Sequence, residues 1–392
     1  MKIKDVLISH IVMVLAFGCS SDKQTVGDIP CIDIRKNYPE KEIVLTDIAD
    51  VSYVHLCTED NAYLYKGGIC DITENTIVVR DESLSNMLFF SRDGKPKSHF
   101  NRMGQGPQEY GSIDRSVTIV YDETVDEVFI ESDKNIFVYS STGLFKRKLV
   151  LPSSVSVFVD FDDQSLFVHD ELLYWKKLSQ RDKVYSSSQL LDSSFYRISK
   201  DDGKVLEYIA FPYHNVDLTI RQGSFTSTGT ARRISHCASG LFLFTPESDT
   251  VFLYDKDKTL TPIICKTPLV SDLDPVVFLK SFTDIGRYQF IIQEKFGNPF
   301  AGGKSETFYY GYDKQTREIF TPAVCLPDYK GEKFKIAGSL FDGKETIVCL
   351  FMDLYKLKEA FAEGRLSGKL KELVATLDEN KDNEVYALAR IK

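Results

Sequence analysis

Basic residues are scarce in this sequence of 392 residues. It has 48 lysines and arginines against 57 aspartates and glutamates, which gives a net charge of −9 at pH 7. A protein that neutralises nucleic-acid phosphates needs a broad basic surface, so we expect no nucleic-acid partner. Hydrophobic residues make up 43% of the chain and exclude wholesale disorder, so the sequence predicts a globular protein.

Short motifs of common metal and catalytic sites are also lacking. No CxxC, GxSxG or HExxH occurs, so the sequence predicts no metal or cofactor and leaves catalytic residues unknown. Segment 297–305 resembles a phosphate loop, but Asn298 stands where a glycine is required. Segment 378–383 alternates oxygen ligands like a calcium loop, but Asn383 replaces the turn glycine. We interpret both segments as ordinary turns.

Long apolar runs are absent except at the N-terminus, where Lys2 and Lys4 precede an apolar run over 6–18. This run is shorter than the roughly 20 residues that cross a bilayer, so we interpret residues 1–18 as a cleaved signal. The following letters, "LAFGCSS", resemble the lipobox of bacterial lipoproteins. The resemblance implies lipidation of Cys19, a membrane as partner and a place in the cell envelope as an outer-membrane lipoprotein. The alternative is an ordinary secretory signal with an incidental cysteine.

Residues 19–40 are predicted to form a flexible tether. Seven further cysteines follow Cys19, and an odd number cannot all pair within the chain. Most of them lie in apolar runs, where a thiol behaves as a small hydrophobe. Cys57 with Cys70 is the disulfide that we would test first, since an exported chain meets oxidising conditions.

Short strands with turns between them dominate the chain from residue 43 onward. A unit of strand, turn, strand, break, strand and Asp/Gly turn recurs, which is typical of β-propeller blades. We count six units, beginning at residues 69, 117, 157, 234, 284 and about 335. The sequence therefore predicts an all-β fold: one six-bladed β-propeller domain over residues 41–392.

The C-terminal region departs from the repeat. Leucines at helical spacing over about 353–378, with Gly364 and Gly368 between them, predict a short insertion of two helices that dock on the propeller. The last run, 384–392, alternates like a strand. We expect it to close the ring by pairing with the N-terminal run 51–56, which removes exposed edges.

The most specific motif is "RMGQGPQEYGSI", which follows the first unit. Together with the lipobox, the first unit and the C-terminal run, it resembles a family of six-bladed β-propeller lipoproteins of Bacteroidetes. The matching positions include Gly104, Gly106, Glu109 and Tyr110. The resemblance implies the fold and the envelope location, and it implies no particular activity.

Candidate binding residues come from this crossing and from one polar loop. We expect the crossing to return from rim to axis, with Gly106 at a positive φ, and the polar stretch 221–233 to be an exposed loop rather than a strand pair. The candidates for ligand contact are Arg102, Gln105, Glu109, Tyr110 and Arg233. The alternative is that Arg102, Glu109 and Tyr110 only hold the crossing in place.

Two functions remain open at this point. The favoured one is a membrane-anchored binding or scaffold module with a carbohydrate, peptide or protein partner, because a rigid ring with variable loops suits recognition. The other is a hydrolase or lyase that acts on a carbohydrate or lactone in the central channel. Asp71, Asp81, Glu131 and Arg233 are possible contributors to such catalysis.

Overall fold

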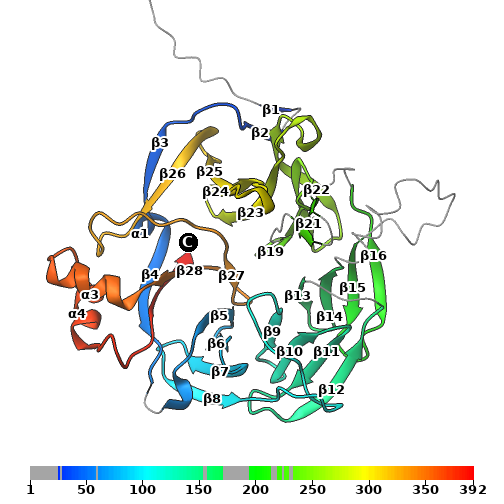
Figure 1. Cartoon of the computed structure of the whole chain (residues 1–392), viewed down its shortest axis with the longest axis vertical. Helices are drawn as coiled ribbons and strands as arrows, with labels where there is room; N and C mark the ends of the chain where they lie inside the picture. The colour runs from blue at the N-terminus through cyan, green and yellow to red at the C-terminus, as the bar shows by residue number, and fades with distance from the viewer. Residues whose placement is uncertain are drawn as a thin grey trace, which may run out of the picture.

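The computed structural model describes residues 25–26, 29–58, 61–152, 157–170, 194–212, 219–222, 225–228 and 233–392. These residues form a ring of six antiparallel blades (Figure 1). The predicted all-β six-bladed propeller is confirmed. The predicted signal at 1–18 and the lipidation site Cys19 lie outside the described residues.

Three consecutive blades form the first half of the ring, each with its strands in chain order from the axis outward. Blade 1 contains β5 (Gly67–Ile72), β6 (Thr76–Asp81), β7 (Asn86–Ser91) and β8 (Pro96–Phe100). Blade 2 contains β9 (Ile119–Asp122), β10 (Glu127–Ser132), β11 (Asn135–Tyr139) and β12 (Phe145–Val150). Blade 3 contains β13 (Val157–Asp162), β14 (Ser165–His169), β15 (Phe195–Ser199) and β16 (Val205–Ile209).

The second half of the ring takes strands from both ends of the chain. Blade 4 contains β19 (Ile234–Cys237), β20 (Gly240–Leu243), β21 (Thr250–Asp255) and β22 (Leu260–Thr267). Blade 5 contains β23 (Val277–Ile285), β24 (Tyr288–Lys295), β25 (Glu306–Asp313) and β26 (Glu318–Cys325), so it begins earlier than the predicted residue 284. Blade 6 contains β27 (Leu340–Phe341), β28 (Thr346–Met352), β29 (Val385–Ile391) and the N-terminal strand β4 (Ala49–His55).

Ring closure follows the prediction. The C-terminal strand β29 pairs antiparallel with β4, with Ala389 opposite Val51. Two further N-terminal strands add to the outer edges of blades 4 and 5: β2 (Ile29–Asp33) runs parallel to β22, and β3 (Glu40–Val44) runs parallel to β26. The N-terminal segment therefore forms a belt across three blades (Figure 1), and the predicted tether 19–40 is wrong from residue 29 onward.

Burial explains why the middle strands of a blade have continuous apolar runs. Both faces of β6 and β7 are covered by neighbouring blades, and the segments "IVV" and "MLFF" are fully buried. The outer strand β8 has a solvent-facing side and alternates instead. Apolar clusters fill the spaces between successive blades around the ring. The core is thus divided among blade interfaces, which makes each blade depend on its neighbours.

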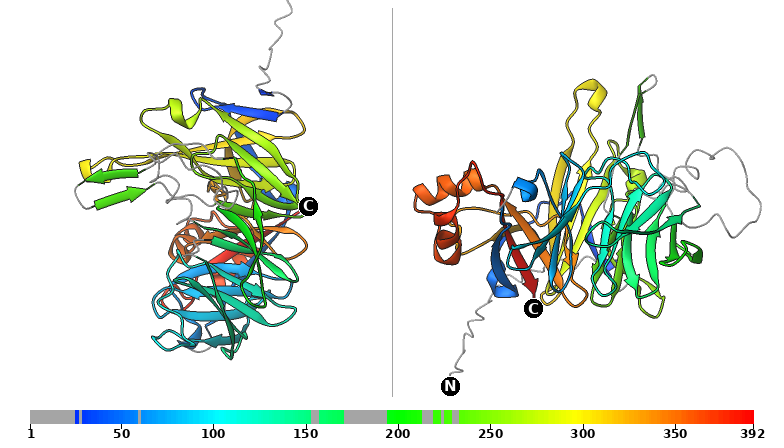
Figure 2. Two further views of the ribbon diagram at one scale, coloured as in Figure 1. Left: turned by 90° about the vertical axis from the view of Figure 1, so that its right-hand side faces the viewer. Right: turned by 90° about the horizontal axis from the view of Figure 1, so that it is seen from below.

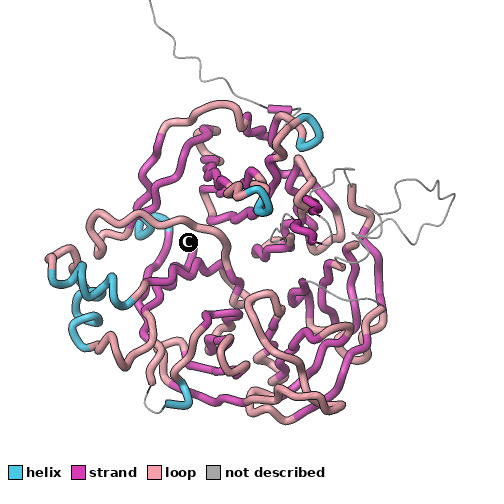
Figure 3. The backbone as a smooth tube through the Cα atoms, viewed as in Figure 1, coloured by secondary structure: helices cyan, strands magenta, loops and turns pink. Residues whose placement is uncertain are grey.

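Two features stand outside the blades. Helices α3 (Leu354–Ala362) and α4 (Gly368–Thr376) dock at one edge of the ring (Figure 3), where Leu357 and Leu370 are buried against the core between blades 5 and 6. The predicted pair of helices is confirmed, with Gly364 at φ 71° between them. The polar stretch 221–233 contains part of a hairpin, β17 (Thr219–Gln222) with β18 (Phe225–Thr228), so the expectation of a loop without paired strands is wrong. This hairpin projects from one face (Figure 2).

Candidate functional site

The inner strands of the blades surround a channel along the axis of the ring. Its cavity has a volume of about 1840 Å³ and is lined by residues of β5, β9, β13, β19 and β27. Further lining comes from the link between β26 and β27 and from the turns after the inner strands. A cavity of this size admits a ligand larger than most metabolites. The channel is therefore the candidate site.

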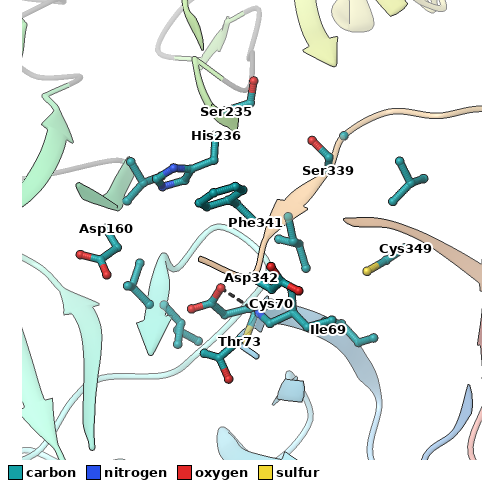
Figure 4. Close-up of a pocket in the computed structure, with 18 of the residues that line it drawn as sticks. Ile69, Cys70, Thr73, Asp160, Ser235, His236, Ser339, Phe341, Asp342 and Cys349 are labelled. Atoms are coloured by element: carbon teal, nitrogen blue, oxygen red, sulfur yellow. Dashed lines mark hydrogen bonds between the residues drawn. The ribbon is translucent and has the colours of Figure 1, made fainter. Parts of the chain in front are cut away.

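Two rings lie face to face inside the channel. The imidazole of His236 on β19 and the phenyl ring of Phe341 on β27 have centroids 5.5 Å apart and planes 10° from parallel. Figure 4 shows them side by side, contributed by blades 4 and 6. Both side chains are half-buried. They provide a flat surface on which an apolar face of a ligand can stack.

Asp71 supplies an unusual carboxyl group to the wall. Its two oxygens accept hydrogen bonds from the backbone N–H of Ile72 (2.8 Å) and of Tyr121 (2.7 Å). The side chain touches the channel but lies deep within the ring, and burial raises the pKa of Asp71 to about 7. The carboxyl of Asp160 across the channel wall adds to this rise through its charge. Asp71 is therefore poised to gain or lose a proton near neutral pH.

A buried lysine holds two other acidic residues of the wall. The ammonium of Lys200 lies 2.7 Å from Asp122 and 2.8 Å from Asp160, and so bridges blades 2 and 3. Burial raises the pKa of Asp160 despite this ion pair. Burial also opposes ionisation of Asp122, but the hydrogen bonds from Lys200 and Thr124 and the charge of Lys200 together outweigh it, so the pKa of Asp122 is lowered. Both carboxylates therefore stabilise the contact between blades 2 and 3.

Turn residues at one end of the channel connect neighbouring blades in the same way. Glu123 accepts hydrogen bonds from the hydroxyl of Thr73 (2.9 Å) and the backbone N–H of Asn75 (3.1 Å). Lys344 forms an ion pair with Glu74 at 2.5 Å. The thiol of Cys70 also faces the channel, but burial raises its pKa to about 12, so it stays protonated at neutral pH. A thiol in this state is a poor nucleophile.

Comparison with protein families gives one match, which spans nearly the whole propeller. The family described as "Domain of unknown function (DUF4934)" matches residues 29–390. The chain belongs to the DUF4934 family. The match begins at β2, which agrees with the structural finding that residues 29–40 are part of the propeller.

Among solved structures, one shares the fold of this DUF4934 chain. A "putative exported protein" from Bacteroides fragilis is 17% identical, with a TM-score of 0.59, and the alignment covers 91% of this chain and 99% of that one. A luciferin-regenerating enzyme (9% identity, TM-score 0.38, 88% and 98% covered) and a streptogramin B lyase (8%, 0.38, 88% and 98%) align less closely. Comparison with curated proteins finds no match. The first similarity indicates the fold, and the other two carry no argument.

The candidate residues of the glycine-rich crossing lie away from the channel. Tyr110 is buried, and its hydroxyl accepts from the backbone N–H of Arg102 and donates to the carbonyl of Ser85, both at 2.9 Å. The guanidinium of Arg102 donates to the carbonyl of Gly143 at 2.8 Å. Gln105 is exposed. These contacts organise the crossing, and ligand contact by these residues remains a prediction.

Gly106 differs from its prediction, because its φ lies outside the left-handed region. The carboxylate of Glu109 instead accepts a hydrogen bond from the backbone N–H of Gly106 at 2.8 Å. A Cβ on Gly104 would lie 1.9 Å from this carboxylate. Glycine at residue 104 thus leaves room for the carboxylate of Glu109 to lie against the backbone.

Most of the remaining candidates also lie outside the channel. Arg233 is buried beside β19 and is not among the channel-lining residues. Asp81 is buried in a turn, where it accepts from the backbone N–H and hydroxyl of Ser83. Of the suggested catalytic contributors, only Asp71 lines the channel. The sequence missed His236 and Phe341, although the position of His236 in the first strand of a blade could have placed it at the axis.

The structure does not bring Cys57 and Cys70 together, so it gives no support to the disulfide expected between them. Cys70 lies on β5, the innermost strand of blade 1. Cys57 follows β4, the outermost strand of blade 6, and its backbone N–H bonds to Gly94. The oxidising conditions of an exported chain suggested a bond between these thiols, whereas the blade geometry puts them at opposite radial positions.

Proposed function

We propose that this protein is an exported binding module whose ligand enters the axial channel. The stacked rings of His236 and Phe341, half-exposed inside a cavity of about 1840 Å³, carry the proposal. Several acidic residues of the wall are already engaged in contacts between blades, so the two rings are the groups best placed to meet a ligand. Export and anchoring through a lipid on Cys19 are part of the proposal and rest on the N-terminal sequence.

The chemistry of the wall favours a polar ligand with one apolar face, such as a sugar ring of a carbohydrate. An aromatic ring stacks on the C–H face of such a ring, while carboxyl and backbone groups bind its hydroxyls. A peptide or protein partner fits the wide opening less well than a chain of sugar units, because a folded protein cannot reach rings inside the channel. The shape of the channel thus supports carbohydrate as the ligand class.

The test is a binding screen of purified protein against soluble oligosaccharides by isothermal titration calorimetry. Phe341→Ala removes one ring of the stack and should weaken binding by about 5- to 150-fold, which corresponds to the loss of an aromatic contact of about 1–3 kcal/mol. Tyr208→Ala, which truncates an exposed ring on the outermost strand of blade 3, is the matched control and should bind like the wild type. Equal affinity of the Phe341→Ala variant would reject the channel as the site.

One observation favours the second candidate, an enzyme of the hydrolase or lyase class. A carboxyl with a pKa of about 7 inside a channel suits general acid or base catalysis. The same oligosaccharides, incubated with protein and analysed by mass spectrometry, distinguish the two functions. Cleavage that is lost in Asp71→Asn would favour the enzyme, and an intact bound ligand would favour the binding module.

A further inference from the structure

We propose that Cys31 and Cys265 form a disulfide that fastens the N-terminal belt to blade 4. Cys31 lies on β2 and Cys265 on β22, and the two residues are direct partners in the parallel ladder between these strands. Nothing in the sequence spacing indicates this pair, since 233 residues separate the two cysteines. The proposal concerns a cross-link outside the channel and is independent of any ligand.

The ladder geometry suits a cross-link. Neighbouring strands lie about 4.8 Å apart, and directly opposed residues point their Cβ atoms to the same face. This separation falls within the roughly 4.4–6.8 Å between Cα atoms that a disulfide spans. A hydrogen bond between the two thiols lowers the pKa of Cys31 and raises that of Cys265, which agrees with thiols in contact.

The register of β2 is fixed on both sides of the pair. Ile32 is 1% exposed and packs into the core between blades 4 and 5, so a slip by one residue would expose it. Beyond the strand, the backbone N–H of Ile34 donates to the carbonyl of Thr267 at 2.9 Å. On the other strand, Lys266 is held by a buried ion pair with Asp249 at 2.7 Å. The two thiols are therefore kept opposite each other.

The other described cysteines lack this arrangement. Cys325 occupies the corresponding place in blade 5, on the strand that receives β3, but its ladder partner is Val44. Cys349 is opposed by Leu388, and Cys237 by Gly240. Within the described ranges, Cys31 and Cys265 are thus the two cysteines that face each other across a ladder.

The chemistry is a thiol–disulfide exchange with a disulfide oxidant, either a small-molecule disulfide or a protein that carries one. One of the two cysteines attacks the oxidant as its thiolate and forms a mixed disulfide with it, which releases one thiol. The thiolate of the other cysteine then attacks the sulfur of the first, the protein disulfide forms, and the second thiol leaves. Two protons and two electrons pass from the cysteines to the two product thiols, so the exchange is balanced.

The disulfide would also protect the belt against peeling. Strand β2 pairs with blade 4 over only three residues of the parallel ladder. A force on the chain before residue 29 reaches blade 4 through this short ladder. A covalent bond at residue 31 transfers such a force to blade 4 before the belt opens, and it closes a loop of more than 200 residues, which restricts the unfolded chain strongly.

The test counts thiols in the full chain before and after exposure to oxidised glutathione, using a thiol reagent in denaturant. Wild type should lose two thiols, and peptide mapping without reductant should recover the Cys31 and Cys265 peptides joined. Cys31→Ser and Cys265→Ser should lose none, whereas the matched control Cys325→Ser should still lose two.

Retention of all thiols by the wild type, or linkage between any other pair, would overturn the proposal. If the serine variants do not fold, the fastening role is tested on the wild-type protein alone, by comparing its reduced and oxidised forms. Reduction by a phosphine should lower its Tm by several degrees, and reoxidation should restore it. A Tm that is the same in both redox states, despite a joined peptide, would overturn the fastening role.

Discussion

At the scale of single residues, Asp71 is the most informative side chain of the channel. Its carboxyl accepts hydrogen bonds from two backbone N–H groups, while burial raises its pKa to about 7. Backbone donors favour the charged form, and burial disfavours it more strongly. The outcome is a group whose charge changes within the physiological pH range.

This pKa predicts a pH-dependent stability. The folded-state pKa lies above the value of about 3.9 in an unfolded chain, so the folded protein binds the extra proton between pH 4 and 7. The contribution of Asp71 to stability is therefore lost as pH rises through about 7. Between pH 5 and 8, the wild type should lose about 1–3 kcal/mol of unfolding free energy relative to Asp71→Asn, since channel solvent reduces the full effect.

The measurement is urea unfolding of both proteins at pH 5, 6, 7 and 8. Asp201→Asn, which changes an exposed aspartate in the turn after β15, is the control and should follow the wild-type profile. Parallel profiles for wild type and Asp71→Asn would contradict a raised pKa at Asp71.

At the scale of elements, the strand β29 holds the ring closed. It lies between β28 and β4, so its loss would leave β4 without a partner and β28 paired only with the short strand β27. Its residues from Val385 to Ala389 are 0–3% exposed and belong to the cores on both sides of blade 6. The C-terminal strand therefore supports two blade interfaces as well as its own sheet.

Changes in β29 should lower the free energy of unfolding, and the loss should be larger for a deletion of the strand than for a single substitution in it. Deletion of residues 384–392 should yield insoluble protein, because the lost burial exceeds the net stability of a typical domain, about 5–15 kcal/mol. Leu388→Ala should lower the unfolding free energy by about 2–4 kcal/mol in chemical denaturation. Leu206→Ala removes a leucine that is 52% exposed on β16 and should change it by less than about 0.5 kcal/mol. A soluble deletion variant with an unchanged melting curve would exclude the closing role.

At the scale of the whole molecule, the N-terminal belt connects blades 4, 5 and 6 before the chain begins blade 1. Strands β2, β3 and β4 join three successive blades in chain order. The glycine at residue 94 illustrates how closely the belt packs on blade 1, since a Cβ there would lie 2.0 Å from the carbonyl oxygen of His55. The belt thus joins the two ends of the ring.

The proposed membrane anchor leads to a prediction about the complete precursor. If Cys19 carries the lipid, Cys19→Ser should move the protein from the membrane fraction to the soluble fraction, or block processing of its signal. Fractionation of cells followed by immunoblotting measures both effects. Cys57→Ser is the control and should leave the distribution unchanged. Normal cleavage and full membrane retention of Cys19→Ser would refute lipid anchoring at this residue.

The sequence by itself determined the propeller, because each blade carries its own local signals. Alternating or continuous apolar runs, turns at Asp and Gly residues, and a regular spacing recur six times, and local patterns of this kind depend little on distant contacts. The same holds for the helices at 354–376 and for the closing strand, whose leucines and valines follow the period of their element. The belt strands β2 and β3 were missed because each is short and gains its stability from a distant blade.

Only the tertiary structure decided which side chains share the channel and which thiols meet. His236 and Phe341 are more than 100 residues apart, and blades 4 and 6 bring them into contact across the axis. Arg102, Glu109 and Tyr110 form the most distinctive motif of the sequence, but their hydrogen bonds hold a crossing outside the channel. Cys31 and Cys265 became partners only through the ladder between β2 and β22. The local sequence determines the residue period of each strand and the turns between strands. Contacts between blades depend instead on how all six blades pack around one axis.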